Sequence, residues 1–205
     1  MIYLNNYGWN DKLSQLKQES TYNALTHGRI SIVHRTCYEV VSENGLFQCE
    51  LTGNMMYGKS DIELPCTGDW VLFQPFDEHK GIIVDMLPRE RTLYRKKNGT
   101  VADKQAIASY VDKAFIVQSL DDNFNVRRAE RFMVQMQEEN INPVLVFNKA
   151  DLGFDEQKVE EQIRHIARQI PVFFTSIHQP QTILQLRESI SAGETVVFVG
   201  SSGVG

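Results

Sequence analysis

The sequence lacks the features that mark membrane, exported or disulfide-bonded proteins. No apolar run approaches the roughly 18 residues that a membrane-spanning helix requires. The N-terminus has neither a basic flank nor an apolar signal core, so we expect no export. The three cysteines, Cys37, Cys49 and Cys66, form no CxxC pair and are odd in number, which argues against zinc ligation and against a disulfide set. We therefore expect a cytoplasmic protein with no membrane partner.

An overall excess of positive charge is also missing. The chain has 21 Lys and Arg against 26 Asp and Glu, a net charge of −5, which excludes a protein that is basic throughout. Positive charge nevertheless gathers locally, because residues 93–113 carry five basic and two acidic side chains. With the residues just before it, this basic stretch comprises Arg89, Arg91, Arg95, Lys96, Lys97 and Lys104. A solvated junction between domains and a patch that contacts nucleic acid are both compatible with it.

The first half of the chain has the alternating pattern of short β-strands. Alternation or β-type composition is found over residues 28–34, 38–41, 46–51, 68–73 and 81–87. Asn44-Gly45 between two of these runs is a strong hairpin signal. About five strands separated by turn residues predict a small closed barrel, of the OB type at this size, with an SH3-like barrel as the alternative.

The second half alternates buried strands with helices. Continuous apolar runs occur at residues 113–118, 143–147, 171–175 and 195–199, and helical windows at 127–139, 155–169 and 182–191 separate them. This pattern predicts a parallel sheet covered on both faces, a three-layer α/β fold. We therefore expect an N-terminal extension over residues 1–22, an OB-type barrel over 23–92, a basic connector over 93–112 and an α/β domain over 113–205.

The strand expected at 143–147 runs directly into Asn148, Lys149, Ala150 and Asp151, a match to the pattern NKxD. It lies at the carboxyl end of a strand, where open α/β sheets bind ligands. The carboxylate of Asp151 can accept from the ring N–H and the exocyclic amine of guanine, a donor pair that adenine does not present. Asn148 can tie neighbouring loops together, and the Lys149 stem can lie along the base. The alternative is a solvated helix N-terminus that Asp151 caps.

A second strand runs into a glycine-rich segment with the spacing G-x-x-x-x-G, which comprises Gly200, Ser201, Ser202, Gly203, Val204 and Gly205. In such loops consecutive backbone N–H groups point inward and bind phosphate oxygens. The full pattern continues with Lys for the terminal phosphates and Ser or Thr for Mg²⁺, which we expect beyond residue 205. A flexible tail is the alternative, and the direct attachment to a core strand argues against it.

The two motifs occur in an unusual order. In an ordinary GTPase the phosphate loop precedes the guanine motif, whereas here NKAD comes first. Between them Ser176 follows a strand where GTPases place a loop whose backbone N–H contacts the guanine O6, although the local Thr-Ser-Ile departs from the usual Ser-Ala. A circularly permuted phosphate-loop GTPase domain puts all three elements in place.

With these motifs in order, the chain resembles the ribosome small-subunit-dependent GTPase A family, in which an OB-fold precedes a permuted GTPase domain. The resemblance covers most of the chain after about residue 23. It is carried by Gly28–Ile30, Thr67–Val71, Leu87–Arg91, Ile107–Lys113, Phe124–Arg131, Asn148–Leu152 and Gly200–Gly205.

The resemblance implies a factor that binds and hydrolyses GTP with Mg²⁺ during late maturation of the small ribosomal subunit. It implies contact with ribosomal RNA and favours an RNA-binding role for Arg89, Arg91, Arg95, Lys96 and Lys97. The family also has a zinc module near its C-terminus, for which this chain supplies no ligands. We expect a monomer, and we expect Arg127, Arg128 and Arg131, beside Glu130, to be ordinary solvated or ion-paired residues.

Two alternatives stay open at this point. The chain could be an OB-type RNA-binding protein whose α/β half senses nucleotides without hydrolysis. A metabolic Rossmann-type enzyme is disfavoured because no G-x-G-x-x-G follows a first strand. No residue of the 205 is expected to activate water or bind a metal, so we expect these residues alone not to hydrolyse GTP.

Overall fold

The computed structural model describes residues 1–96, 104–121, 124–153, 156–168 and 170–205. The chain divides into two units, Met1–Val111 and Asp112–Gly205, each with its own core. Within the described ranges no helix has the length and apolar character needed to span a bilayer.

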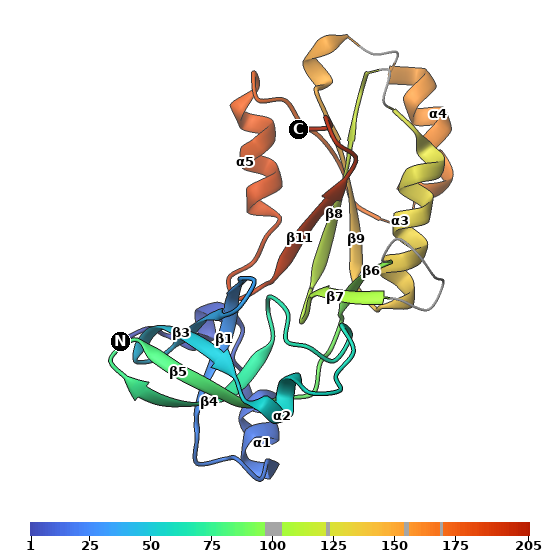
Figure 1. Ribbon diagram of the computed structural model, residues 1–205. Helices are drawn as coiled ribbons and strands as arrows, with labels where there is room; N and C mark the ends of the chain where they lie inside the picture. Colours follow the sequence, from blue (N-terminus) through green and yellow to red (C-terminus); the bar gives the residue numbers. More distant parts are fainter. Residues whose placement is uncertain (97–103, 122–123, 154–155, 169) are drawn as a thin grey trace. The chain divides into compact units, whose positions relative to one another are not determined.

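Five strands of the first unit close into a barrel in the order β1-β2-β3-β5-β4 (Figure 1). These are β1 (Thr26–Val33), β2 (Tyr38–Ser42), β3 (Gly45–Leu51), β4 (Trp70–Asp77) and β5 (Lys80–Met86). β3 pairs with β5 in parallel, and β1 pairs with both β2 and β4 antiparallel. This Greek-key order is that of the OB-type barrel, so the OB expectation is confirmed over the SH3-like alternative. The β2–β3 hairpin also forms as expected, with Ser42 opposite Gly45.

The N-terminal segment is part of the core of this unit. On β4, Val71 and Phe73 belong to a cluster with residues of β1, β2, β3 and β5, while Trp70 and Leu72 belong to a second cluster. Because side chains alternate along a strand, these two pairs lie on opposite faces of β4. The second cluster is completed from a short 3₁₀ helix η1 (Leu4–Tyr7) and the helix α1 (Asp11–Glu19), which contribute Leu4 and Leu13. Residues 1–19 therefore cover strand β4 from outside.

Replacing Leu13 with Ala is expected to lower the free energy of unfolding of the barrel unit by about 2–5 kcal/mol, the usual range for removing a buried leucine. Leu13 is only 3% exposed. The two tryptophans, Trp9 and Trp70, both lie in this unit with ring centroids 4.8 Å apart, so their fluorescence in a urea titration reports on it. Gln18→Ala, on the exposed side of α1, is the control. Equal stability of the two variants would show that α1 is not part of the core.

The segment expected as a connector contains a two-stranded antiparallel ribbon. β6 (Leu93–Lys96) pairs with β7 (Lys104–Ala108), and both strands belong to the first unit. Leu93 and Ala106 are buried, and Thr67 forms an isolated bridge with Ala108. A single helical turn, α2 (Gly53–Met56), follows β3.

The second unit is a four-stranded parallel sheet in the order β10-β9-β8-β11. The strands are β8 (Lys113–Ser119), β9 (Asn142–Asn148), β10 (Val172–Phe174) and β11 (Val196–Gly200). Helices α3 (Val126–Glu138) and α4 (Glu156–Ala167) cover one face, and α5 (Pro180–Glu188) covers the other (Figure 1). On β8, Ile116 packs with α3 and α4, while Phe115 packs with Leu186 of α5. The three-layer expectation is confirmed.

Candidate functional site

The sheet order brings the two motifs to one edge. Parallel strands share their carboxyl edge, and β8 lies between β9, which ends at Asn148, and β11, which ends at Gly200. The NKAD segment and the glycine-rich loop, far apart in sequence, therefore lie beside each other at the edge where α/β sheets bind ligands. Because NKAD precedes the loop in the chain, the domain is circularly permuted.

Two side chains of NKAD hold the glycine-rich loop directly. Asn148 donates from Nδ2 to the carbonyl oxygen of Val204 at 3.0 Å. Lys149 donates from Nζ to the carbonyl oxygen of Gly203 at 2.7 Å. Both hydrogen bonds are accepted by carbonyl oxygens of the loop and do not involve its backbone N–H groups. In loops of this type the backbone N–H groups are the ones that bind phosphate.

Glycine is required at two positions of the loop for different reasons. A Cβ at Gly200 would come within 2.7 Å of the carbonyl oxygen of Val117 on the neighbouring strand β8. Gly203 has a φ of +82°, in the left-handed region that L-residues with side chains rarely adopt. The first glycine thus permits close strand pairing, and the second permits the turn of the loop.

Asp151 is oriented by a residue of the next strand's loop. The hydroxyl of Ser176 donates to the Asp151 carboxylate and accepts from the backbone N–H of His178 at 3.0 Å. The hydrogen bond from Ser176 holds the pKa of Asp151 below its ordinary value, and the side chain is exposed. An ionised, exposed carboxylate in a fixed direction is what recognition of two N–H donors requires.

Ser176 itself is fully buried, and its backbone N–H donates to Thr182 Oγ1 at 3.1 Å. The structure therefore places Ser176 behind Asp151, with its N–H already bonded, which favours a role in orienting the carboxylate over a direct contact with a base. Ala150 ties the same loops together, since its N–H donates to the carbonyl oxygen of Thr175 at 3.1 Å.

Asp121 belongs to the site although sequence reasoning missed it. Its carboxylate accepts from Lys149 Nζ at 2.9 Å and from the hydroxyl of Ser119 at 2.6 Å. Asp121 follows β8 at the same carboxyl edge, so strand position could have identified it. Thr175, which donates to Asn148 Oδ1 at 3.2 Å, could have been found in the same way because it follows β10.

Arg89 of the basic stretch is bonded inside the first unit. Its guanidinium binds Asp69, with Nη2 2.6 Å from Oδ2, and donates to the carbonyl oxygens of Ile62 and Leu64. The side chain of Arg89 is 12% exposed and that of Asp69 is 0% exposed. This guanidinium therefore has little left to offer a phosphate group.

The other basic residues have different surroundings. Arg91 donates to the carbonyl oxygen of Val111 at 3.0 Å and lies 3.5 Å from the Glu90 carboxylate. Arg95 is exposed on β6, and Lys96 pairs in register with Lys104 of β7. Lys97 lies outside the described residues. On the β6–β7 ribbon, Arg95 donates to Gln105 Oε1 at 3.1 Å, and both Arg95 and Lys104 are exposed.

The described residues offer no metal site. No group of three or more His, Cys, Asp or Glu side chains among them is arranged to hold a metal ion. Burial raises the pKa of Cys49 and of Cys66 to about 12.

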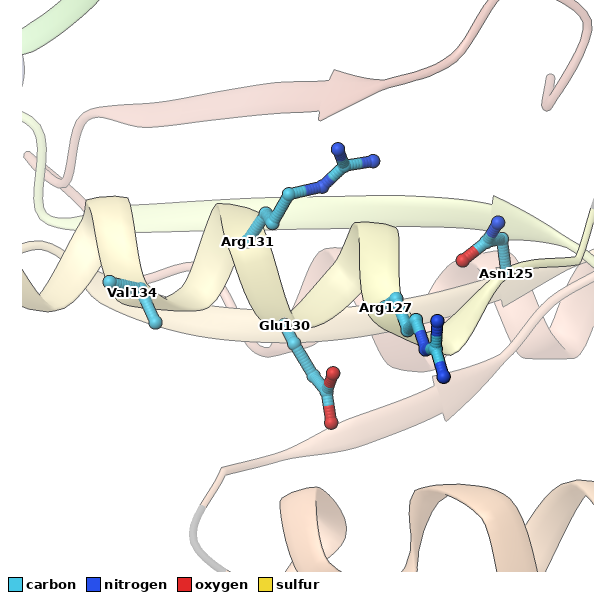
Figure 2. Close-up of a pocket in the computed structure, with 5 residues that line it drawn as sticks. All are labelled: Asn125, Arg127, Glu130, Arg131 and Val134. Atoms are coloured by element: carbon cyan, nitrogen blue, oxygen red, sulfur yellow. The ribbon is translucent and has the colours of Figure 1, made fainter.

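A shallow pocket of about 610 Å³ lies on the outer side of α3, lined by Asn125, Arg127, Glu130, Arg131 and Val134 (Figure 2). None of these residues belongs to NKAD or to the glycine-rich loop. We therefore distinguish this pocket from the candidate nucleotide site.

Comparison with known proteins agrees with this geometry. The chain is 74% identical over 199 residues to small ribosomal subunit biogenesis GTPase RsgA 1 of Bacteroides thetaiotaomicron, covering 97% of this chain and 56% of that protein. It is 34% identical to the RsgA of Methanosarcina acetivorans, covering 97% and 53%. The crystal structure of YjeQ from Thermotoga maritima matches with a TM-score of 0.68 and 25% identity, over 88% of this chain and 62% of that one. YloQ, described as a circularly permuted GTPase, matches with a TM-score of 0.63 and 23% identity, over 91% and 63%.

The chain spans just over half the length of these curated relatives. The model of the RsgA GTPase family matches residues 86–205, which include the NKAD segment and the glycine-rich loop. By this match over more than half of its residues, the chain belongs to the RsgA GTPase family.

Proposed function

We propose that the protein binds and hydrolyses GTP and acts in maturation of the small ribosomal subunit. The observation that carries the nucleotide assignment is the bonding of Asn148 and Lys149 to the carbonyl groups of Val204 and Gly203. It joins a guanine-recognition motif to a phosphate-type loop at one sheet edge, as a single guanine nucleotide requires.

Different residues of the chain bind the base and the phosphates of the nucleotide. Asp151 accepts from the base, the stem of Lys149 lies along it, and the N–H groups of Gly200–Gly205 surround the phosphates. Mg²⁺ neutralises charge on the phosphates in enzymes of this class. No residue described here is assigned to Mg²⁺ or to the activation of water, so this chain's own part is to bind and orient the nucleotide.

The proposal that the partner is the small ribosomal subunit is supported by the names of the relatives and by the positive charge of the β6–β7 ribbon. Curated relatives are named small ribosomal subunit biogenesis GTPases. We assign residues 23–92 and the β6–β7 ribbon to RNA contact and residues 113–205 to the nucleotide, in a monomer that works in the cytoplasm. On the ribbon, Arg95, Lys96 and Lys104 supply the positive charge, since Arg89 is bonded to Asp69.

The test of this function is the GTPase rate of the full-length gene product with and without purified small ribosomal subunits. We expect hydrolysis by the protein alone to be slow and to rise when subunits are added. Binding of GTP without hydrolysis under both conditions would instead favour an RNA-binding protein that senses nucleotides. Absence of GTP binding would contradict the assignment of the site.

In a binding titration with the same subunits at several salt concentrations, Arg95→Ala combined with Lys104→Ala is expected to weaken binding and to flatten its dependence on salt, because each lost phosphate contact lowers the slope by roughly one. Lys158→Ala, on an exposed lysine of α4 in the other unit, is the control for loss of positive charge. If the double variant binds with unchanged affinity and salt dependence, the β6–β7 ribbon does not contact RNA.

A further inference from the structure

Arg128 makes a further attachment to the glycine-rich loop, in addition to those from NKAD. Its Nη1 donates to the hydroxyl of Ser201 at 2.6 Å, although the two residues are 73 positions apart in the sequence. Sequence reasoning treated Arg128 as an ordinary surface arginine, whereas the structure places its guanidinium on the second residue of the loop.

The start of α3 explains how Arg128 reaches this position. Asn125 caps the helix, with its Oδ1 accepting from the N–H of Arg128 at 3.2 Å. α3 follows β8 and packs against it, so its first turn lies near the carboxyl edge of the sheet, where the loop begins.

The loop is therefore held by residues of two different elements. Arg128 bonds Ser201 from α3, while Lys149 and Asn148 bond Gly203 and Val204 from the end of β9. Such loops bind phosphate only when successive N–H groups point the same way, so a loop fixed in advance loses less conformational freedom when it binds. A guanidinium on the loop also brings positive charge to the element that receives phosphates.

We propose that Arg128 is a positioning residue of the nucleotide site, which fixes the phosphate-binding loop through the hydroxyl of Ser201. This inference rests on the proposed function, because it requires that the loop bind the phosphates of a nucleotide. It goes further by assigning affinity for those phosphates to a residue outside both motifs.

Arg128→Ala is expected to raise the Kd for GDP and GTP about tenfold, which corresponds to about 1.4 kcal/mol. Ser201→Ala should have a similar effect, and the double variant should be no weaker than the worse single variant, because both changes remove the same bond. Arg127→Ala is the matched control, since Arg127 is the preceding residue of the same helix, is exposed and lines the surface pocket (Figure 2). Titration of the full-length protein with fluorescent guanine nucleotides measures all four variants.

A second measurement separates positioning of the loop from general damage to the domain. In protein that carries Asp151→Asn and binds xanthine nucleotides, Arg128→Ala should weaken their binding by the same factor, since it acts on the loop and not on the base. A purely structural role would instead lower the midpoint of thermal unfolding. If Arg128→Ala does not fold, Ser201→Ala, which leaves the guanidinium in place, carries the test.

Two results would overturn the role of Arg128. One is an Arg128→Ala variant that binds GDP as tightly as the wild type. The other is a double variant, Arg128→Ala with Ser201→Ala, whose loss of binding free energy equals the sum of the two single losses. Wild-type protein that binds no guanine nucleotide at all would contradict the proposed function itself, so the two failures can be told apart.

Discussion

Replacing Asp151 with Asn is expected to raise the Kd for GTP by at least about a hundredfold and to shift preference to xanthosine triphosphate. The amide presents an N–H group where guanine also presents one, so a hydrogen bond becomes a clash of donors. Xanthine carries an oxygen at that position and restores the pair. Competition between the two nucleotides for the full-length protein measures the change.

Glu160→Gln is the matched control, because Glu160 is an exposed acid on α4 of the same unit. It should leave both affinities unchanged. GTP affinity that survives Asp151→Asn would remove Asp151 from the base-binding site and with it the guanine assignment.

The same carboxylate sets how GTP binding responds to acid. Because the hydrogen bond from Ser176 keeps the pKa of Asp151 below its ordinary value, the carboxylate stays ionised as the pH falls through that ordinary range. Binding should be lost only when the pH falls through the lowered pKa. Without the hydroxyl, in Ser176→Ala, the loss should begin at higher pH.

The second large effect is expected in the barrel. Arg89→Ala leaves the carboxylate of Asp69 buried with no cation beside it, and removing one partner of a buried ion pair costs about 3–5 kcal/mol. Such a loss would unfold much of the first unit under mild denaturation. A urea titration followed by tryptophan fluorescence reads it directly, since both tryptophans lie in this unit.

Lys59→Ala provides the comparison, because the Lys59–Glu63 pair is exposed and pairs of that kind are worth about 0–1 kcal/mol. If Arg89→Ala and Lys59→Ala unfold at the same urea concentration, Arg89 is not a structural residue. Arg89 would then again be a candidate for RNA contact.

Local patterns were sufficient to predict most of the fold. The alternation of residues 46–51 and the Asn44-Gly45 turn anticipate β3 and its hairpin, and the apolar runs at 113–118 and 143–147 anticipate β8 and β9. Helix α1 was not anticipated, because its stability comes from packing Leu13 on the barrel and not from a strong amphipathic pattern. Asn10, which caps α1 through Oδ1, was the available signal.

The candidate site, too, could be predicted only in part. The NKAD segment and the glycine-rich loop could be read from sequence because each is a continuous motif attached to a strand. Contacts made across the fold could not. The sequence around Arg89 does not predict its ion pair with the buried Asp69. The sequence around Arg128 likewise does not predict its hydrogen bond to Ser201. Both contacts depend on which elements the tertiary fold brings together.

The permuted order also has a consequence for how the site is assembled during translation. The residues that hold the glycine-rich loop, namely Arg128, Asn148 and Lys149, all precede it in the chain. A ribosome that makes this protein therefore completes the anchors before it makes the loop, and β11 joins β8 after β9 and β10 have been made. In an unpermuted GTPase the loop is made first and must wait for its anchors. Here the three residues that hold the phosphate-binding loop are made before the loop itself, so the loop can bond to them as soon as it folds.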